Sequence, residues 1–120
     1  MTKPTFDLQA HSLHSDGALT PSDVVARAAE AGVELLALSD HDTVDGVDEA
    51  LAAGVRHGVA VVPATEISSV DGRYEDLHVL GYGIDHRDAT LAERLRAARA
   101  DRELRAERMA ARLRELGFAI

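Results

Sequence analysis

Three short apolar segments in this sequence are each followed by a side chain that commonly binds metal ions, and this arrangement limits the folds that the chain can adopt. The segments and the side chains that follow them are residues 6–8 with His11, residues 35–38 with His41, and residues 59–62 with Glu66. Successive candidate ligands are 30 and 25 residues apart, close to the roughly 30 residues of a βα unit. Parallel α/β barrels collect their chemistry at the C-terminal ends of their strands. The spacing therefore predicts an α/β fold in which three distant segments meet at one site.

The composition indicates a single domain of modest size. The 120 residues are 46% hydrophobic and 28% charged, which is ordinary for a globular protein. The absence of cysteine excludes disulfides, thiolate catalysis and zinc fingers. No apolar run approaches the roughly 20 residues of a membrane span, and residues 1–4 lack the apolar segment of a signal peptide. We therefore expect a cytoplasmic protein without a membrane partner.

Charge is distributed unevenly along the chain. Residues 1–90 carry 5 Lys and Arg against 16 Asp and Glu, residues 91–120 carry 8 against 5, and the net charge is −8. An acidic body does not attract polyanions by itself, so no stable double-stranded DNA partner is expected. A phosphorylated substrate would need metal ions that neutralise the carboxylates of its site.

The pattern of apolar residues and caps predicts alternating strands and helices in residues 1–88 and one long helix in residues 89–120. Thr20 and Pro21 are typical of a helix start, and Gly32 is typical of its end. The expected elements are strands at 5–9, 34–38, 59–62, 67–70 and 77–80, helices at 20–32, 44–57 and 89–116, and a hairpin turn at 71–76.

Five side chains form a candidate metal site, because imidazoles and carboxylates are the usual ligands of divalent transition metals. They are His11, Asp16, His41, Glu66 and His78. Each of them alone is also typical of a structural or solvated residue, and the Asp40–His41–Asp42 segment is also typical of a helix N-cap. Their joint spacing favours a metal site, in which Asp40 and Asp42 are candidates for orienting ligands or relaying protons.

Two further residues are candidates for contact with substrate. His14 lies in the loop after the first strand, and Arg73 lies at the tip of the predicted hairpin, where it could meet a phosphate. A solvated position is the alternative for both. The arginines of residues 91–116 could likewise attract an anion or form a solvated helix face.

The motifs around the candidate ligands resemble those of a known family. They are Asp7-Leu8-x-x-His11, Ser15-Asp16-Gly17-Ala18-Leu19-Thr20-Pro21, Ser39-Asp40-His41-Asp42-Thr43, Glu66-Ile67-Ser68 and Leu77-His78-Val79-Leu80-Gly81. Together they resemble the PHP (polymerase and histidinol phosphatase) family of metal-dependent phosphoesterases over residues 5–116. The segments at 15–21 and 39–43 are most similar to the branch that removes phosphate from nucleoside 3′,5′-bisphosphates and trims short RNA from its 5′ end.

The resemblance implies the N-terminal portion of a distorted (βα)7 barrel that holds up to three divalent ions, with Mn²⁺ first and Zn²⁺ or Fe²⁺ as alternatives. It implies that His11 and Glu66 bind one metal and that Glu66 bridges to a second, which His78 also holds. It implies that Asp16 and His41 hold a third. The expected enzyme uses metal-activated water to hydrolyse phosphate esters of nucleotides or short RNA.

Two departures from the family pattern modify this expectation. The family usually opens with His-x-His, and here Gln9 stands at the first position, where it offers only a neutral carbonyl oxygen to a metal. A complete (βα) barrel needs roughly 200 residues or more, so we expect the chain to be the N-terminal part of a longer protein, with little activity alone. The helix at 89–116 is then expected to begin an insertion.

Three alternatives remain open at this point. An amidohydrolase also places histidines after the first strand of a barrel, although no clear lysine is present here for the bridging role that lysine often has in that class. A non-catalytic module that binds metal or nucleotide is compatible with Gln9. Residues 91–116 could also act as a basic helix that binds a partner, in which case RNA binding would depend strongly on salt.

Overall fold

The computed structural model describes residues 5–120, apart from the side chain of Glu75. Residues 1–4, the start of the part predicted at 1–88, lie outside the described residues. The elements are β1 (Phe6–Ala10), α1 (Pro21–Glu30), β2 (Leu35–Leu38), α2 (Val47–His57), β3 (Ala60–Asp71), β4 (Tyr74–Tyr82) and α3 (Ala89–Glu115). The three predicted helices are confirmed. The second begins at Val47 rather than at residue 44, because Asp45 N donates to Thr43 Oγ1 in a turn that precedes the helix (3.1 Å).

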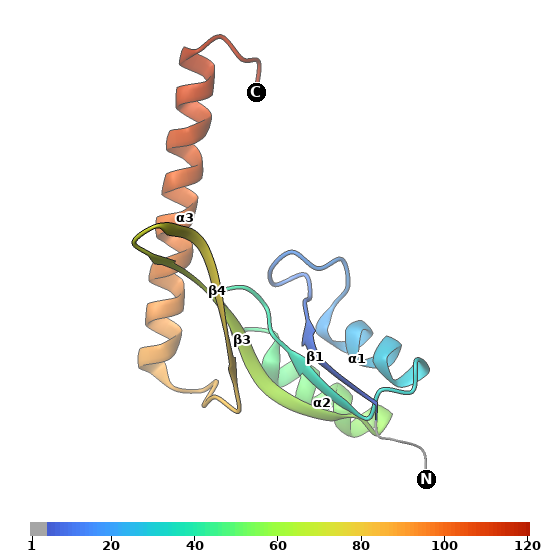
Figure 1. Cartoon of the computed structure of the whole chain (residues 1–120). Coiled ribbons are helices and arrows are strands. Elements are labelled where there is room, and N and C mark those ends of the chain that lie inside the picture. The colour runs from blue at the N-terminus through green and yellow to red at the C-terminus, as the bar shows by residue number, and fades with distance from the viewer. Residues whose placement is uncertain (1–4) are drawn as a thin grey trace.

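The strands form one curled sheet in the order β1-β2-β3-β4 (Figure 1). β1 pairs with β2 and β2 with β3 in parallel, whereas β3 and β4 form an antiparallel hairpin. The sheet resembles half of a barrel, and the C-terminal ends of β1 and β2 point toward the same edge. The full (βα)7 barrel stays a prediction.

The prediction of separate strands at 59–62 and 67–70 is wrong, because β3 continues from Ala60 to Asp71. It is one strand of 12 residues, whose first part (60–63) pairs with β2 and whose second part (64–71) pairs with β4. Pro63, inside this strand, lacks the N–H that a strand interior usually needs. Its position is tolerated because β3 changes partners there, so the strand continues through Glu66.

The core lies between the sheet and the two shorter helices, which cover the same face of the sheet (Figure 1). α1 and α2 contribute small apolar side chains, and β2 contributes leucines. The buried cluster consists of Val25, Leu36, Leu38, Ala50, Ala53 and Val59. Because β2 is packed in this core, the segment that follows it, Ser39–Thr43, is anchored at the edge of the sheet.

α3 runs past the β3–β4 hairpin, and its C-terminal half projects away from the other elements (Figure 1). Asp88 caps it, because its side chain accepts from Leu91 N (2.7 Å). Leu95 is the buried residue of this helix. No helix within residues 5–120 combines the length and the apolar character that crossing a membrane requires.

Candidate metal centre and cleft

Glu66 lies at the centre of the candidate site. Its side chain is only 7% exposed and is surrounded by polar groups from three other segments. His11 Nε2 lies 2.9 Å from Glu66 Oε2, His78 Nδ1 lies 3.3 Å from Oε1, and His41 Nε2 lies 4.0 Å from Oε2. Gln9 Nε2 donates to Oε2 (3.0 Å). Side chains from the ends of β1 and β2 and from within β3 and β4 therefore meet around one carboxylate.

Backbone hydrogen bonds bring the segment after β2 onto β3. Glu66 N donates to Asp40 O (3.1 Å), Asp42 N donates to Glu66 O (2.9 Å), and His41 and Glu66 form a parallel bridge. These bonds extend the β2–β3 pairing beyond Leu38. They fix the His41 ring beside Glu66 without a regular strand.

Asp16 forms the second centre of negative charge. Its Oδ1 atom lies 2.7 Å from His11 Nδ1, and its Oδ2 atom lies 3.5 Å from His41 Nε2. The hydrogen bond from His11 holds the pKa of exposed Asp16 below its usual value near 3.8, and the charge of the two imidazoles acts in the same direction against a small desolvation effect. Asp16 is therefore ionised at neutral pH and available to a cation.

The donor set fits divalent metal ions. Two triads place their ligand atoms within 4.8 Å of one another, namely His11 with Asp16 and His41, and His41 with Glu66 and His78. In the described part of the chain, His41 Nδ1 is a buried nitrogen without a hydrogen-bond partner, and buried His11 Nε2 meets Glu66 Oε2 only as a charge contact that forms no hydrogen bond. Buried polar atoms are rarely left unpaired, and mixed nitrogen and oxygen ligands suit Mn²⁺, Zn²⁺ and Fe²⁺. His41 belongs to both triads, and Glu66 of the second triad also lies beside His11 of the first.

Asp40 lies beneath this cluster and supports it. It is 2% exposed, and its carboxylate accepts from Ser12 N, Ser12 Oγ and Ser15 Oγ, each at 2.6 Å. Its backbone oxygen accepts from Thr65 Oγ1 (3.1 Å). Asp40 therefore joins the loop that carries His11 and Asp16 to the end of β2 and to the middle of β3.

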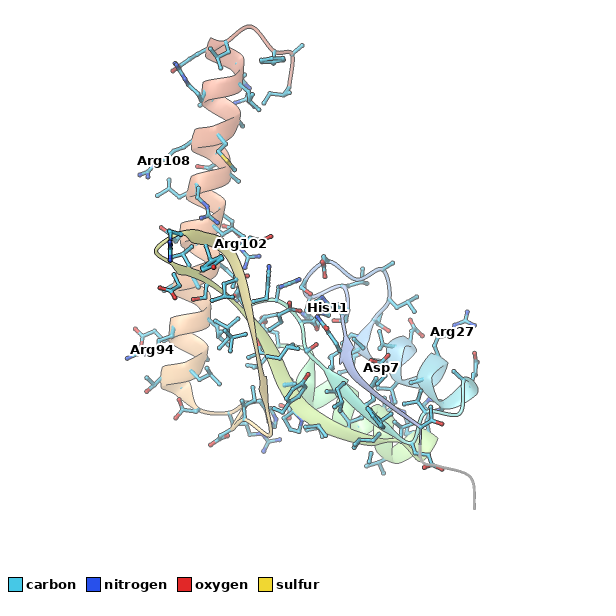
Figure 2. The ribbon with its side chains drawn as sticks, viewed as in Figure 1. Asp7, His11, Arg27, Arg94, Arg102 and Arg108 are labelled. Atoms are coloured by element: carbon cyan, nitrogen blue, oxygen red, sulfur yellow. The ribbon has the colours of Figure 1, made fainter. Side chains whose placement is uncertain are left out.

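Asp42 faces a different partner, the long helix. Its fully buried carboxylate accepts from Ser68 N (2.8 Å) and forms an ion pair with Arg102 of α3. Arg102 Nη2 also donates to Ser68 Oγ (2.7 Å), and Arg99 Nη1 donates to Asp42 O (3.2 Å). Figure 2 shows Arg102 on the side of α3 that faces the hairpin, whereas Arg94 and Arg108 point away.

A cleft of about 680 Å³ separates the cluster from α3. One wall carries metal-ligand candidates, and the α3 wall carries arginines together with Asp101 and Glu103. The lining includes His14, Ser15, Asp16, His41, Asp42, Ser68, Asp76, His78, Arg99, Arg102 and Arg105. The arrangement offers a place for cations beside a place for anions.

A family model for the PHP domain matches residues 7–117. The chain belongs to the PHP family. A relative of this PHP chain in Chromobacterium violaceum, a 3′,5′-nucleoside bisphosphate phosphatase, is 44% identical over 114 residues, which cover 95% of this chain and 40% of that protein. A 5′-3′ exoribonuclease of Haemophilus influenzae is 39% identical over 119 residues, which cover 98% of this chain and 42% of that protein.

The fold of this PHP chain is also found in a solved structure from Chromobacterium violaceum, described as an amidohydrolase with bound sulfate and no metal. The TM-score is 0.87 at 43% identity, over 97% of this chain and 40% of that one. The chain thus spans about two fifths of the length of the relatives that it matches. The family inferred from the motifs is confirmed.

The candidate metal centre and cleft bring together most of the residues that the sequence singled out, but not Arg73. Gln9 contacts Glu66, and exposed His14 lines the cleft. Arg73 is exposed at the turn between β3 and β4 and is not among the residues that line the cleft. The basic groups nearest the site come instead from α3.

Sequence reasoning missed several polar residues of this PHP site. Ser12, Ser15 and Thr65 hold Asp40 in place, and their types gave no signal beyond their position beside the ligand motifs. Arg99 and Arg102 were assigned a solvated helix face as the alternative to anion binding. Their spacing of three residues places them on one face of a helix, but only the packing of α3 shows that this face meets Asp42.

Proposed function

We propose that this chain carries the metal-binding part of a phosphoesterase that acts on nucleotides or short RNA. The observation that carries the proposal is the position of Glu66, which three histidines and Gln9 surround at the edge of a curled sheet. The position fits the role of a carboxylate shared between cations. In this assignment His11, Glu66 and His78 hold two ions, and Asp16 and His41 hold a third.

Each side chain has a task that follows from its contacts. Divalent ions at such a site supply Lewis acidity toward water and toward phosphoryl oxygens. Asp40 orients the loop of His11 and Asp16 through Ser12 and Ser15. The Glu66 carboxylate lies in a pocket that is almost closed to solvent, so its attraction for an ion there would be only weakly screened. His11, His41 and His78 would offer ring nitrogens to such an ion.

The relatives support phosphate esters as the substrate class. One carries the name of a nucleoside bisphosphate phosphatase and another that of an exoribonuclease. The sulfate in the related Chromobacterium violaceum structure is an anion of the same shape as phosphate. That structure is described as an amidohydrolase, so amide hydrolysis is the second candidate. The single lysine, Lys3, precedes the described residues and gives little support for a bridging lysine.

Metal binding is the first test. Titration with Mn²⁺ by calorimetry, with elemental analysis of the dialysed protein, should show binding that His41→Ala weakens by about tenfold or more, since His41 belongs to both triads. His57→Ala is the matched control, because His57 is exposed at the end of α2. Equal Mn²⁺ affinity in the His41 and His57 variants would refute the assignment.

Hydrolysis is the second test. Release of inorganic phosphate from adenosine 3′,5′-bisphosphate, and shortening of a 5′-phosphorylated RNA oligonucleotide, should depend on Mn²⁺ and be lost in His41→Ala. An anilide substrate is assayed in parallel. Turnover of the anilide without release of phosphate would favour the amidohydrolase candidate instead.

A further inference from the structure

We propose that Asp76 of β4 is a positioning residue of the candidate metal centre, which holds the His78 ring so that Nδ1 rather than Nε2 binds an ion beside Glu66. The proposal rests on the proposed function, because it concerns an ion that is assigned to this centre. Asp76 precedes the motif that predicted His78 and was expected in the hairpin turn at 71–76, whereas it lies within β4.

The two nitrogens of the His78 ring face different carboxylates. Nε2 is hydrogen-bonded to Asp76 Oδ1 (2.8 Å), whereas Nδ1 lies 3.3 Å from Glu66 Oε1. Asp76 and His78 are two residues apart in β4, so their side chains leave the same face of the strand. The ring therefore lies between an exposed carboxylate on its own strand and a buried carboxylate on β3.

The chemistry of imidazole connects these two contacts. A neutral ring carries its hydrogen on one nitrogen and offers a lone pair to a metal ion on the other. A carboxylate that accepts the ring N–H decides which nitrogen remains for the metal. Asp76 favours the hydrogen on Nε2, which leaves the lone pair of Nδ1 directed toward the ion at Glu66.

The same arrangement occurs at His11 with the two nitrogens exchanged. His11 Nδ1 lies 2.7 Å from Asp16 Oδ1, and its Nε2 lies 2.9 Å from Glu66 Oε2. Each oxygen of Glu66 thus faces one imidazole, and each of these imidazoles has a second carboxylate on its other nitrogen. This recurrence within one site supports a role for Asp76 beyond that of a solvated strand residue.

The His78 ring needs such support because little else fixes its rotation. Its side chain is 34% exposed, and the His41 ring packs edge-on with the two centroids 5.1 Å apart. A half-turn about the bond from Cβ to the ring would replace Nδ1 beside Glu66 by a carbon atom. The hydrogen bond from Nε2 to Asp76 opposes this rotation. An ion on Nδ1 makes Nε2–H a stronger donor, so we expect the contribution of Asp76 to appear in metal affinity.

Two other roles are possible for Asp76, and they predict different results. A solvated aspartate would leave metal affinity unchanged when it is replaced. An aspartate that binds the ion directly would be replaced as poorly by asparagine as by alanine. Within the described residues, the donor triad of β4 contains His78 and not Asp76.

The experiment measures Mn²⁺ affinity by calorimetry. Asp76→Ala should weaken binding by about tenfold. Asp76→Asn should lose clearly less, because its amide oxygen can still accept from His78 Nε2–H. Asp71→Ala is the matched control, since Asp71 is an exposed residue of the same hairpin. No loss in Asp76→Ala beyond the control, or equal losses for alanine and asparagine, would overturn the proposal.

A double-mutant cycle tests whether Asp76 acts through His78. In a His78→Ala background, Asp76→Ala should change the remaining Mn²⁺ affinity by less than about twofold. Urea denaturation of each variant confirms that it is folded. Losses that simply add would show that Asp76 acts on the ion by another route, and would overturn the positioning role.

Nuclear magnetic resonance identifies the nitrogen that binds the ion. In protein loaded with diamagnetic Zn²⁺, the ring ¹⁵N shifts of His78 should show the metal on Nδ1 and the hydrogen on Nε2. Zn²⁺ bound through Nε2 would contradict the proposal, because the hydrogen bond to Asp76 could not then persist.

Failure of the metal assignment can be recognised separately. If the wild-type chain binds neither Mn²⁺ nor Zn²⁺, the proposed function fails, and the ring shifts are measured in metal-free protein in alkaline buffer, where imidazoles are ordinarily neutral. A ring hydrogen on Nε2 in the wild type that moves toward Nδ1 in Asp76→Ala would support positioning of His78 by Asp76. The same distribution in both proteins would exclude it.

Discussion

His11 Nε2 lies 2.9 Å from Glu66 Oε2, although His11 follows β1 and Glu66 lies within β3. β2 separates these two strands in the sheet. The contact exists because the chain after β1 turns back over the edge of the sheet, where Asp40 holds it through Ser12 and Ser15. The geometry of the candidate metal centre therefore depends on a loop and not only on strands.

Glu66→Gln should weaken Mn²⁺ binding by more than about tenfold, because it removes the charge that two histidines and Gln9 surround. Calorimetric titration measures the effect. Glu30→Gln is the control, since Glu30 is an exposed residue of α1. Similar Mn²⁺ affinities for the two variants would remove Glu66 from the site.

Gln9→His should strengthen Mn²⁺ binding, because an imidazole would replace an amide that now donates its N–H to Glu66 (3.0 Å). The same titration measures the change. Gln9→Leu, which can neither donate nor ligate, serves for comparison. An affinity in Gln9→His no higher than in the wild type would show that position 9 is not a ligand position in this chain.

Asp40→Ala should lower the free energy of unfolding by roughly 3 kcal/mol, because three donors of the buried loop would lose their acceptor. Urea denaturation measures the loss. Exposed Asp71, at the end of β3, is the site of the control substitution to alanine. A loss no larger than in Asp71→Ala would contradict the supporting role.

Gly17→Ala should destabilise the loop of Asp16 by roughly 1–3 kcal/mol. A Cβ atom at Gly17 would lie 2.4 Å from His11 O, so the backbone on either side would have to move. Gly81→Ala is the control, because its nearest neighbour, a methyl group of Ile84, would be 3.4 Å away. Thermal unfolding compares the two variants, and equal midpoints would show that the loop adapts without cost.

The pair of Asp48 and His86 should make stability depend on pH in the acid range. His86 and Arg87 hold the pKa of Asp48 below its usual value near 3.8. A carboxylate whose pKa is lowered by folding stabilises the protein above the unfolded pKa, and this contribution disappears as the pH falls through the folded pKa. The difference in urea midpoint between wild type and Asp48→Asn should thus be constant above about pH 5 and vanish in stronger acid. A difference that grows toward low pH would contradict this assignment.

The sequence predicted the order of elements well because caps and apolar runs are local signals. Thr20 accepts from Asp23 N as an N-cap should, and β2 is the buried run that was expected. The continuity of β3 could not be read in the same way. Pro63 is a local signal for a break, and only the exchange of β2 for β4 as partner explains why the strand continues.

The grouping of the candidate ligands was predictable where they follow strands, but the contact that α3 makes beside them was not. His11, His41 and Glu66 were found from spacing, and the structure places them together. Asp40 and Asp42, on either side of His41, carried the same expectation from sequence, yet one faces the loop of Ser12 and the other faces Arg102. Asp42 also has a positive φ (51°), a conformation that no local signal predicted.

The single strand that pairs first with β2 and then with β4 has a consequence for hydrogen exchange. Opening of the β3–β4 hairpin would move His78 away from Glu66, whereas the pairing of β3 with β2 could persist. An ion held by both side chains would therefore slow the exchange of hairpin amides, because it binds only the closed form. The exchange rates of amides in the β2–β3 pairing would change less. The exchange pattern would therefore show which part of β3 lies near the ion.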